Sequence, residues 1–334
     1  MLTPRRGDGL QSPPAVSAVG LRKSYGDRTV LDGIDLHIPA GSVFALLGPN
    51  GAGKTTTVQI LSTLVAADGG RAQVAGHDVT ASPDGVRTAI GVTGQFAALD
   101  DLLTAEENLI LMADLLRLGK REGRSRAAEL LRRFDIADVA RKRAATFSGG
   151  MRRRLDLAMT LVGDPRVIFL DEPTTGLDPR SRRTMWDTVR SLVAGGTTVF
   201  LTTQYLEEAD QLADRIAVLD GGRIVAEGTA DELKARIPGS HVRLRFTDPA
   251  EYERAVTAFP GAARDADNLA LRVAGDGGLD ALRALLDRLD AAGIRAADLS
   301  VHTPDLDDVF LALTGDGATA TTTTTPPHPK ETLR

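Results

Sequence analysis

One glycine-rich segment constrains this chain more than any other. Residues 48–55 read Gly-Pro-Asn-Gly-Ala-Gly-Lys-Thr, which fits the pattern GxxxxGK[ST]. The apolar run Val43–Leu47 before it is typical of a buried strand, and a helix is expected over about Lys54–Leu64. A strand that turns through such a loop into a helix directs backbone N–H groups and the positive helix end at one place. The segment therefore predicts a phosphate-binding loop in an α/β fold.

The residue types of the loop match the chemistry of a triphosphate. Lys54 is expected to reach the β and γ phosphates as a point charge, and Thr55 to offer its hydroxyl to Mg²⁺. The competing interpretation is a glycine turn with an incidental lysine, but the chain has only six lysines. The predicted nucleotide-binding residues are Gly48, Pro49, Asn50, Gly51, Ala52, Gly53, Lys54, Thr55 and Thr56.

Composition excludes several other classes of protein. The net charge of -5 argues against a chain that binds nucleic acid through its overall charge. With no cysteine there is no disulfide, thiolate zinc site or cysteine nucleophile. No apolar run approaches the ~20 residues of a membrane-spanning helix, and no secretory signal follows the first arginines. A role at a membrane would therefore require a partner to hold the chain there.

Strands and helices alternate along the chain, which indicates a parallel sheet with helices on its faces. We expect disorder at 1–15, a main domain over 16–236 with a helical subdomain at about 99–150, a small C-terminal α/β domain over 240–314, and a disordered tail at 315–334. A ferredoxin-like arrangement is one option for the small domain. The strands expected in the main domain are Ala15–Val19, Val30–Leu31, Ile34–Ile38, Val43–Leu47, Val167–Leu170, Thr198–Thr202, and the hairpin pair Ile216–Leu219 and Arg223–Ala226.

A second candidate for chemistry is the acidic pair after the apolar strand Val167–Leu170. Asp171 is expected to hold Mg²⁺ through water, and Glu172 to act as general base on an attacking water. Taken alone, an acidic pair after a strand is more often a solvated turn or a helix cap.

The segment Phe147-Ser148-Gly149-Gly150-Met151 resembles the LSGGQ signature of ABC transporter ATPases, and it lies between the phosphate loop and the acidic strand as in that family. The resemblance covers about residues 15–232 and implies a P-loop NTPase fold with a β subdomain and a helical subdomain. It also implies that Tyr25 stacks on adenine, that Gln95 contacts Mg²⁺ and the attacking water, and that Asp178 belongs to the D-loop. Without the family, these would be a half-buried tyrosine, a surface glutamine and a turn or capping residue.

Two copies of the cassette are implied by the same resemblance. The signature residues Ser148, Gly149, Gly150 and Met151 of one subunit would cover the ATP held by the phosphate loop of the other. A helix start supplies N–H groups for this purpose. The chain carries one loop and one signature, so it would pair with itself or with a sister subunit. The helical region at about 99–134 would dock the permease. The arginine clusters 152–154 and 180–183 are expected to be solvated faces or partner contacts.

The sequence departs from the family pattern at two positions. Gln204 stands where the family carries a histidine that binds the γ-phosphate, and Met151 replaces the glutamine of the signature. A glutamine amide donates a hydrogen bond but cannot become cationic or pass a proton. The stretches TTQYLEEADQLADRI, GVTGQFAALDDLLT and PDLDDVFLALTG look like daunorubicin-resistance-type exporter ATPases. That subgroup pairs with a separate six-helix permease of the ABC-2 type, which implies drug or natural-product export from the cytoplasmic face of the membrane.

Two other functions stay open at this point. One is a soluble ABC ATPase in translation or DNA repair, although such proteins carry tandem cassettes or long coiled coils. The other is a nucleotide-gated regulator that binds ATP but hardly cleaves it, because of Gln204. Glu172 argues against the regulator, since a cassette without hydrolysis has little use for a base.

The residue at position 204 generates a first prediction. We expect hydrolysis slower than in a histidine-bearing relative, with ATP binding largely kept, because the amide cannot take up a charge. The Gln204→His variant should therefore turn over ATP faster than the wild type in a steady-state assay. A variant that is no faster would contradict this role for the side chain.

Overall fold

The computed structural model describes residues 13–94, 98–236, 240–275, 278–302 and 304–314. The chain divides into two compact units, Met1–Leu233 and Lys234–Arg334. The sequence placed this division slightly later, around 236–240. The termini expected to be disordered lie outside the described residues, apart from 13–15. No helix in the described ranges is long and apolar enough to cross a membrane.

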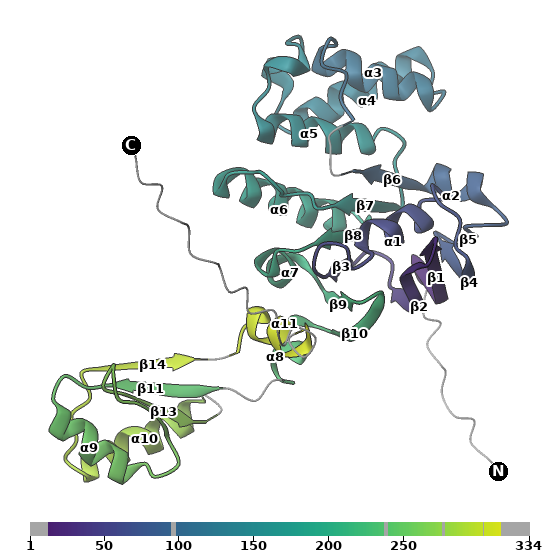
Figure 1. Cartoon of the computed structure of the whole chain (residues 1–334). Coiled ribbons are helices and arrows are strands. Elements are labelled where there is room, and N and C mark those ends of the chain that lie inside the picture. Colours follow the sequence, from purple (N-terminus) through teal and green to yellow (C-terminus); the bar gives the residue numbers. More distant parts are fainter. Residues whose placement is uncertain (1–12, 95–97, 237–239, 276–277, 303, 315–334) are drawn as a thin grey trace, which may run out of the picture. The chain divides into compact units, whose positions relative to one another are not determined.

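A six-stranded sheet forms the centre of the first unit, and its strands follow the order β10-β9-β3-β8-β7-β6 (Figure 1). All neighbouring pairs are parallel except the hairpin of β9 and β10. Every residue of β3, β7 and β8 is buried, so both faces of the sheet are covered at its middle. The strands are β3 Val43–Leu47, β6 Ile90–Thr93, β7 Val167–Asp171, β8 Thr198–Thr203, β9 Arg215–Asp220 and β10 Arg223–Gly228.

A smaller sheet of order β2-β1-β4-β5 packs with the parallel sheet around helix α1, Lys54–Leu61. One apolar cluster joins residues of both sheets to Val58 and Ile60 of this helix. The packing therefore fixes the helix that follows the phosphate loop. The strands of the smaller sheet are β1 Val16–Tyr25, β2 Arg28–Ile38, β4 Gly69–Val74 and β5 His77–Asp78.

The strands β1 and β2 are longer than the sequence indicated. Their pairing shifts register between Ala18 and Leu21 and again between Lys23 and Ser24. Such shifts interrupt the alternation of buried and exposed residues, so a continuous strand resembles several short ones. Helix α1 is shorter than expected, because Thr63 just beyond its end has a φ of 64°. A β-branched residue in the left-handed region ends a helix.

Helices occupy the segment between β6 and β7. α3, Ala105–Leu115, begins with a capping box in which Thr104 and Glu107 bond each other's backbone N–H. Of the apolar residues in this segment, Leu109 and Ala113 are buried whereas Leu116 is 44% exposed. The other helices of this unit are α2 Pro83–Ala89, α4 Lys120–Arg133, α5 Gly149–Thr160, α6 Pro179–Ala194, α7 Leu206–Leu212 and α8 Ala230–Lys234, the last of which ends at the unit boundary.

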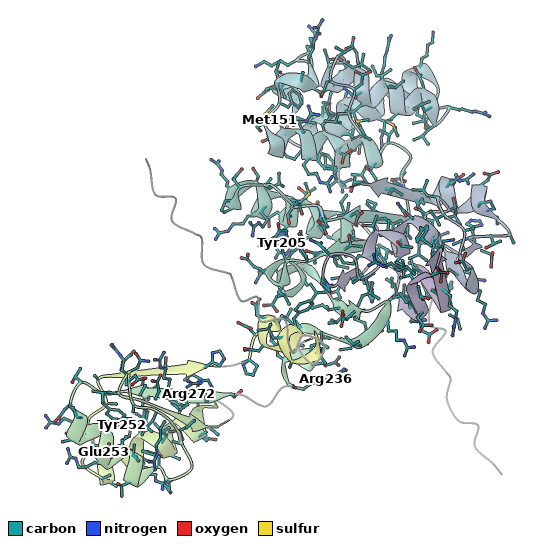
Figure 2. The ribbon with its side chains drawn as sticks, in the orientation of Figure 1. Met151, Tyr205, Arg236, Tyr252, Glu253 and Arg272 are labelled. Atoms are coloured by element: carbon teal, nitrogen blue, oxygen red, sulfur yellow. The ribbon has the colours of Figure 1, made fainter. Side chains whose placement is uncertain are left out.

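The second unit contains a four-stranded antiparallel sheet of order β12-β13-β11-β14. The chain order β-α-β-β-α-β with this strand order is the ferredoxin-like arrangement that the sequence left as an option. Its apolar core includes Tyr252 on α9 (Figure 2), Leu285 on α10 and Leu244 on β11. The elements are β11 His241–Arg245, α9 Pro249–Ala258, β12 Ala263–Asp265, β13 Ala270–Ala274, α10 Leu279–Ala291, β14 Asp298–His302 and α11 Leu306–Thr314.

Three phenylalanines on neighbouring strands carry much of the packing under the parallel sheet. The ring centroids of Phe44 and Phe169 each lie 5.5 Å from that of Phe200, and all three side chains are at most 1% exposed. Tilted aromatic contacts of this kind add to the stabilisation that burial of the rings provides.

We predict that Phe200→Ala lowers the free energy of unfolding of the first unit by about 3–5 kcal/mol, because it leaves a cavity between two rings. Urea unfolding followed by Trp186 fluorescence would measure this, since Trp186 is the only tryptophan of the chain and is buried in this unit. The control Phe200→Leu should lower the free energy of unfolding by less, because leucine fills part of the space left by the ring. Equal losses for the two variants would contradict the packing explanation.

Candidate functional site

The phosphate loop runs from the end of β3 to the start of α1, as the sequence predicted. Gly53 has a φ of 111°, and a Cβ there would stand 2.9 Å from the carbonyl oxygen of Val30. A Cβ on Gly48 would collide with the carbonyl of Leu219. Both positions require glycine, one for its conformation and both for space. The neighbouring strands β2 and β9 therefore hold the loop in its curled form.

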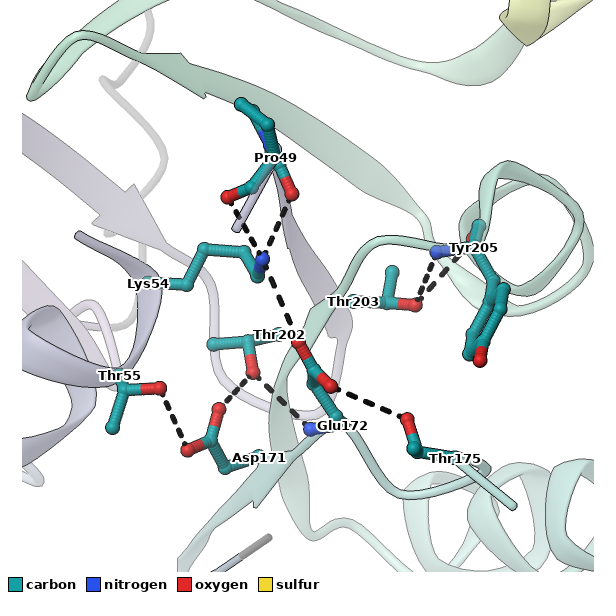
Figure 3. A network of polar contacts seen from close by, with 10 residues as sticks. Pro49, Lys54, Thr55, Asp171, Glu172, Thr175, Thr202, Thr203 and Tyr205 are labelled. Carbon is teal, nitrogen blue, oxygen red and sulfur yellow. Dashed lines mark hydrogen bonds and ion pairs between the residues drawn. The ribbon is translucent and has the colours of Figure 1, made fainter. Parts of the chain in front are cut away.

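Lys54 lies almost fully buried in this loop, with 5% of its surface exposed. Its ammonium donates to the carbonyl oxygens of Gly48, at 2.8 Å, and Pro49, at 3.2 Å (Figure 3). Glu172 Oε1 lies 3.6 Å from the same nitrogen. Burial lowers the pKa of Lys54, and the charge of Glu172 opposes that shift. The loop thus presents a nearly desolvated cation, beside a carboxylate.

The acidic pair stands at the carboxyl end of β7. Thr55 Oγ1 donates to Asp171 Oδ2 at 3.0 Å, and Thr202 of β8 donates to the other carboxylate oxygen of Asp171. Both oxygens of Asp171 are therefore oriented by hydroxyl groups (Figure 3). This fixes the aspartate directly beside the threonine of the phosphate loop.

Glu172 adopts a φ of 49°, which is uncommon for a residue with a side chain. Its backbone N–H donates to the carbonyl oxygen of Thr202 at 3.1 Å, and Thr175 Oγ1 donates to its Oε2 at 3.3 Å. The left-handed conformation turns the carboxylate toward Lys54 (Figure 3). A strained residue that its neighbours hold in place is a frequent feature of functional sites.

The donor set of Thr55 and Asp171 fits a magnesium ion. Both are hard oxygen donors, and Mg²⁺ commonly takes one or two carboxylates and completes its shell with phosphate oxygens and water. Among the described residues no group of three or more His, Cys, Asp or Glu could hold a metal ion alone. The residues therefore suit a metal that arrives with a phosphorylated ligand.

A cavity of about 400 Å³ opens over the loop. Tyr25 lies at its edge with 49% of its surface exposed, and Lys23 Nζ stands 5.3 Å from its ring centroid. An exposed ring beside a phosphate loop can stack on a flat base. The lining residues are Tyr25, Arg28, Val30, Asn50, Gly51, Gly53, Lys54, Thr55, Thr56, Asp171 and Glu172.

Arg28 and Thr202 also belong to the site, although the sequence alone did not indicate them. Arg28 begins β2 and adds a cation to the cavity, and Thr202 orients Asp171 from the adjacent strand. Neither belongs to a recognisable pattern of residues. A threonine at the end of a buried strand was the only available signal for Thr202.

Two of the predicted catalytic residues are not placed in this cavity, and the loop residues Gly48, Pro49 and Ala52 are not among its lining residues either. Gln95 lies outside the described residues. Gln204 follows β8 directly and is partly buried, but it is not among the described residues that line the cavity. Their roles toward the nucleotide stay predictions.

The signature residues surround the start of helix α5. Ser148 caps this helix by accepting a hydrogen bond from the N–H of Met151 (Figure 2) at 3.3 Å. Ser148, Gly150 and Met151 line a separate cavity of about 230 Å³ together with Ser181. The phosphate loop and the signature therefore line different cavities of one chain.

Asp178 caps α6 through bonds from the backbone N–H groups of Arg180 and Ser181, each at 3.0 Å. The hydrogen bonds of Ser181 hold the pKa of Asp178 below its ordinary value. The residue thus behaves as a helix cap within the chain, which was the interpretation favoured without the family. The structure adds that this cap belongs to the helix beside the signature cavity.

The expectation for the arginine cluster 152–154 is wrong for Arg153. Its side chain is buried with 8% exposure and bonds three backbone carbonyl oxygens and the carboxylate of Asp156. Arg152 and Arg154 are partly exposed and also bond neighbouring backbone carbonyls. A run of like charges in a sequence predicts a solvent-exposed surface. The fold shows that Arg153, the middle residue of this run, points inward.

The comparisons with known proteins agree with this geometry. The family described as ABC transporter matches residues 31–175. The daunorubicin resistance ATP-binding protein DrrA3 of Streptomyces coeruleorubidus is 53% identical over 304 residues, which cover 90% of this chain and 96% of that protein. The chain belongs to the daunorubicin-resistance type of ABC transporter ATP-binding proteins. It is an ATPase.

Further relatives extend the comparison. The daunorubicin/doxorubicin resistance ATP-binding protein DrrA of Streptomyces peucetius is 50% identical, over 92% of this chain and 94% of that protein. The Nod factor export ATP-binding protein I of Ralstonia nicotianae is 39% identical, over 92% of this chain and 96% of that protein. The solved structure of cbiO1 from Clostridium perfringens, part of the ABC transporter complex cbiONQ, has a TM-score of 0.63 at 27% identity and covers 67% of this chain and 92% of its own.

The bond from Thr202 to Asp171 in this ABC ATPase generates a prediction. Thr202→Val keeps the shape of the side chain but removes the hydroxyl, so we expect kcat to fall about tenfold and the Mg²⁺ concentration for half-maximal ATPase activity to rise. A titration of ATPase rate against Mg²⁺ would measure both effects.

Thr198 at the start of the same strand offers a matched control. It is equally buried, and its hydroxyl accepts from the N–H of Gly41 at 2.9 Å, away from the cavity. Thr198→Val should leave the Mg²⁺ dependence unchanged. The same shift in both variants would show that the effect reflects stability alone.

Proposed function

We propose that this ABC ATPase powers the export of a drug or natural product through a separate permease of the ABC-2 type at the cytoplasmic face of the membrane. The single observation that supports hydrolysis most strongly is the meeting of Lys54, Glu172 and the Asp171–Thr55 pair at one cavity. The names of the relatives described above, which concern drug resistance and export, support the choice of cargo.

The proposed chemistry assigns each polar group of the cavity a role. The loop N–H groups and Lys54 bind the β and γ phosphates of ATP, and the ring of Tyr25 stacks on adenine. Glu172 accepts the proton of the attacking water as general base. Mg²⁺, held by Thr55 and Asp171, would supply charge neutralisation on the phosphates. Gln95 and Gln204 are proposed to orient the water and the γ-phosphate.

Two subunits are required in this proposal. The signature residues line a cavity of their own. The binding site of the nucleotide held by Lys54 is therefore completed by Ser148, Gly149 and Gly150 of a second subunit. The N-terminus of α5 offers its N–H groups to the γ-phosphate across the interface. ATP then joins the two subunits, and its hydrolysis releases them. A second copy of this chain is the simplest partner.

The helical segment between β6 and β7 offers a surface for the permease. Leu102 and Leu115 are exposed by 76% and 67%, and Leu111 and Leu116 by 41% and 44%. Exposed leucines grouped on neighbouring segments are typical of a protein interface. We therefore place the contact with the permease at α3 and the loop before it.

The test compares the full chain with Glu172→Gln. We expect kcat to fall at least about a hundredfold while the affinity for ATP stays within about twofold, because the amide cannot accept the proton. Glu129→Gln is the matched control. Glu129 lies on α4, where it pairs with Arg126, and neither residue is among those that line the cavity. Its rate should equal that of the wild type.

The transport step is tested on the same variants. The chain is co-expressed and co-purified with a multi-spanning permease of the ABC-2 type, and ATP-driven uptake of daunorubicin into inverted vesicles is measured. Uptake by the wild type that Glu172→Gln abolishes would support the proposal. Equal ATPase rates in the wild type and Glu172→Gln would instead favour a nucleotide-gated regulator. ATP hydrolysis by a chain that does not co-purify with the permease would favour a soluble role.

A further inference from the structure

Arg153 is a buried charged side chain that makes four hydrogen bonds outside the cavity. Its Nε donates to the carbonyl oxygen of Pro173 at 2.9 Å, and its Nη2 lies 3.4 Å from that of Asp171. Its Nη1 donates to the carbonyl oxygen of Gly94 at 2.9 Å and to Asp156 Oδ2 at 3.1 Å. The guanidinium therefore joins α5 to the ends of β7 and β6.

The acceptors of this guanidinium flank the proposed base. Asp171 and Pro173 are the residues on either side of Glu172, and Glu172 itself has the left-handed φ of 49°. A non-glycine residue keeps such a conformation only where its surroundings hold it. Arg153 binds the peptide groups on both sides and thus opposes a return to the ordinary conformation.

The partner carboxylate reaches a second segment. Asp156 Oδ1 accepts from the N–H of Ala98 at 3.1 Å, while its other oxygen pairs with Arg153. Gly94 and Ala98, which the pair binds, stand on either side of residues 95–97. One buried ion pair therefore holds the backbone that leads into and out of that segment, as well as the backbone around Glu172.

The chemistry of the pair favours orientation over simple packing. Taking two charges out of water carries a large desolvation cost, and an apolar pair of similar size often gives equal or better stability. A guanidinium has donors in a fixed plane, so it sets directions that a lysine or an apolar side chain cannot set. Here its donors meet three carbonyl oxygens on two segments.

We propose that the Arg153–Asp156 pair is a positioning unit for ATP hydrolysis, which holds Glu172 in its productive conformation and ties it to the signature helix. The inference rests on the proposed role of Glu172 as general base. Helix α5 begins at the signature residues and carries Arg153 in its second turn. The signature of one subunit contacts the ATP bound by the other subunit. Arg153 thereby links that contact to Glu172 of the subunit that carries the signature.

The test replaces Arg153 by lysine in the full chain. Lysine keeps the charge beside Asp156 but cannot serve the three carbonyl oxygens, so we expect kcat to fall at least about tenfold, with the Kd for ATP within about twofold. Arg152→Lys is the control: Arg152 is adjacent and likewise bonds one carboxylate, of Asp101, and one carbonyl, of Ala144. Its kcat should stay within about twofold of the wild type.

A double-mutant cycle separates positioning from other roles. In a Glu172→Gln background, Arg153→Lys should lower the single-turnover rate by less than about twofold, because the group that it positions is already lost. An equal factor in both backgrounds would overturn the proposal. So would an unchanged kcat of Arg153→Lys, or a loss of ATP affinity that matches the loss of rate.

A second variant covers a failure of Arg153→Lys to fold. Arg153→Gln with Asp156→Asn removes both charges, so that no buried charge is left unpaired. It should show the same low kcat with ATP binding kept; loss of folded protein here too would assign the pair to stability and overturn the proposal. A wild-type rate that Glu172→Gln does not change would refute the proposed function itself, whatever Arg153 does.

Discussion

The burial of Lys54 beside Glu172 is the interaction on which the rest of the site depends. An ammonium with 5% exposure needs acceptors, and the curled loop supplies two carbonyl oxygens while the end of β7 supplies a carboxylate. Three adjacent parallel strands, β3, β8 and β7, end at the same edge of the sheet and bring these groups together. Thr202 on the middle strand donates to Asp171 and accepts from the backbone N–H of Glu172, both at the end of β7. Asp171 in turn accepts from Thr55 after β3. The site is thus a property of strand order as much as of the glycine-rich loop.

Much of the fold could be predicted because its strands are short, apolar and buried on both faces. Val43–Leu47 has the predicted bounds, and the hairpin of β9 and β10 forms around Asp220-Gly221-Gly222. The β1 and β2 strands could not be predicted in full, since register shifts depend on a partner strand that a local pattern does not contain. The end of α1 at Leu61 likewise depends on a backbone conformation at Thr63 that no residue type there indicates.

The residues of the site likewise fall into those with a local sequence signal and those without one. The phosphate loop and the acidic end of β7 were predictable because a short sequence motif determines the local backbone geometry. Thr202, Arg28 and Arg153 were not, because each acts on a segment distant in the sequence: Thr202 lies 31 residues from Asp171, and Arg153 lies 59 residues from Gly94. A single threonine or arginine has no pattern until the fold supplies its neighbour. The assignments of Gln95 and Gln204 still rest on family resemblance.

The run Arg152–Arg154 shows how one residue type serves three environments on a single helix. Arg152 binds Asp101 and the carbonyl of Ala144, Arg154 binds the carbonyls of Phe134 and Asp135, and Arg153 turns inward to the ends of β6 and β7. Successive helix positions lie about 100° apart, so three consecutive arginines reach three directions. Two of them fix α5 within the helical subdomain, and the third fixes the same helix to the parallel sheet. A displacement of the signature residues therefore acts on the backbone beside Glu172, which is the physical link that the proposed positioning role of Arg153 requires.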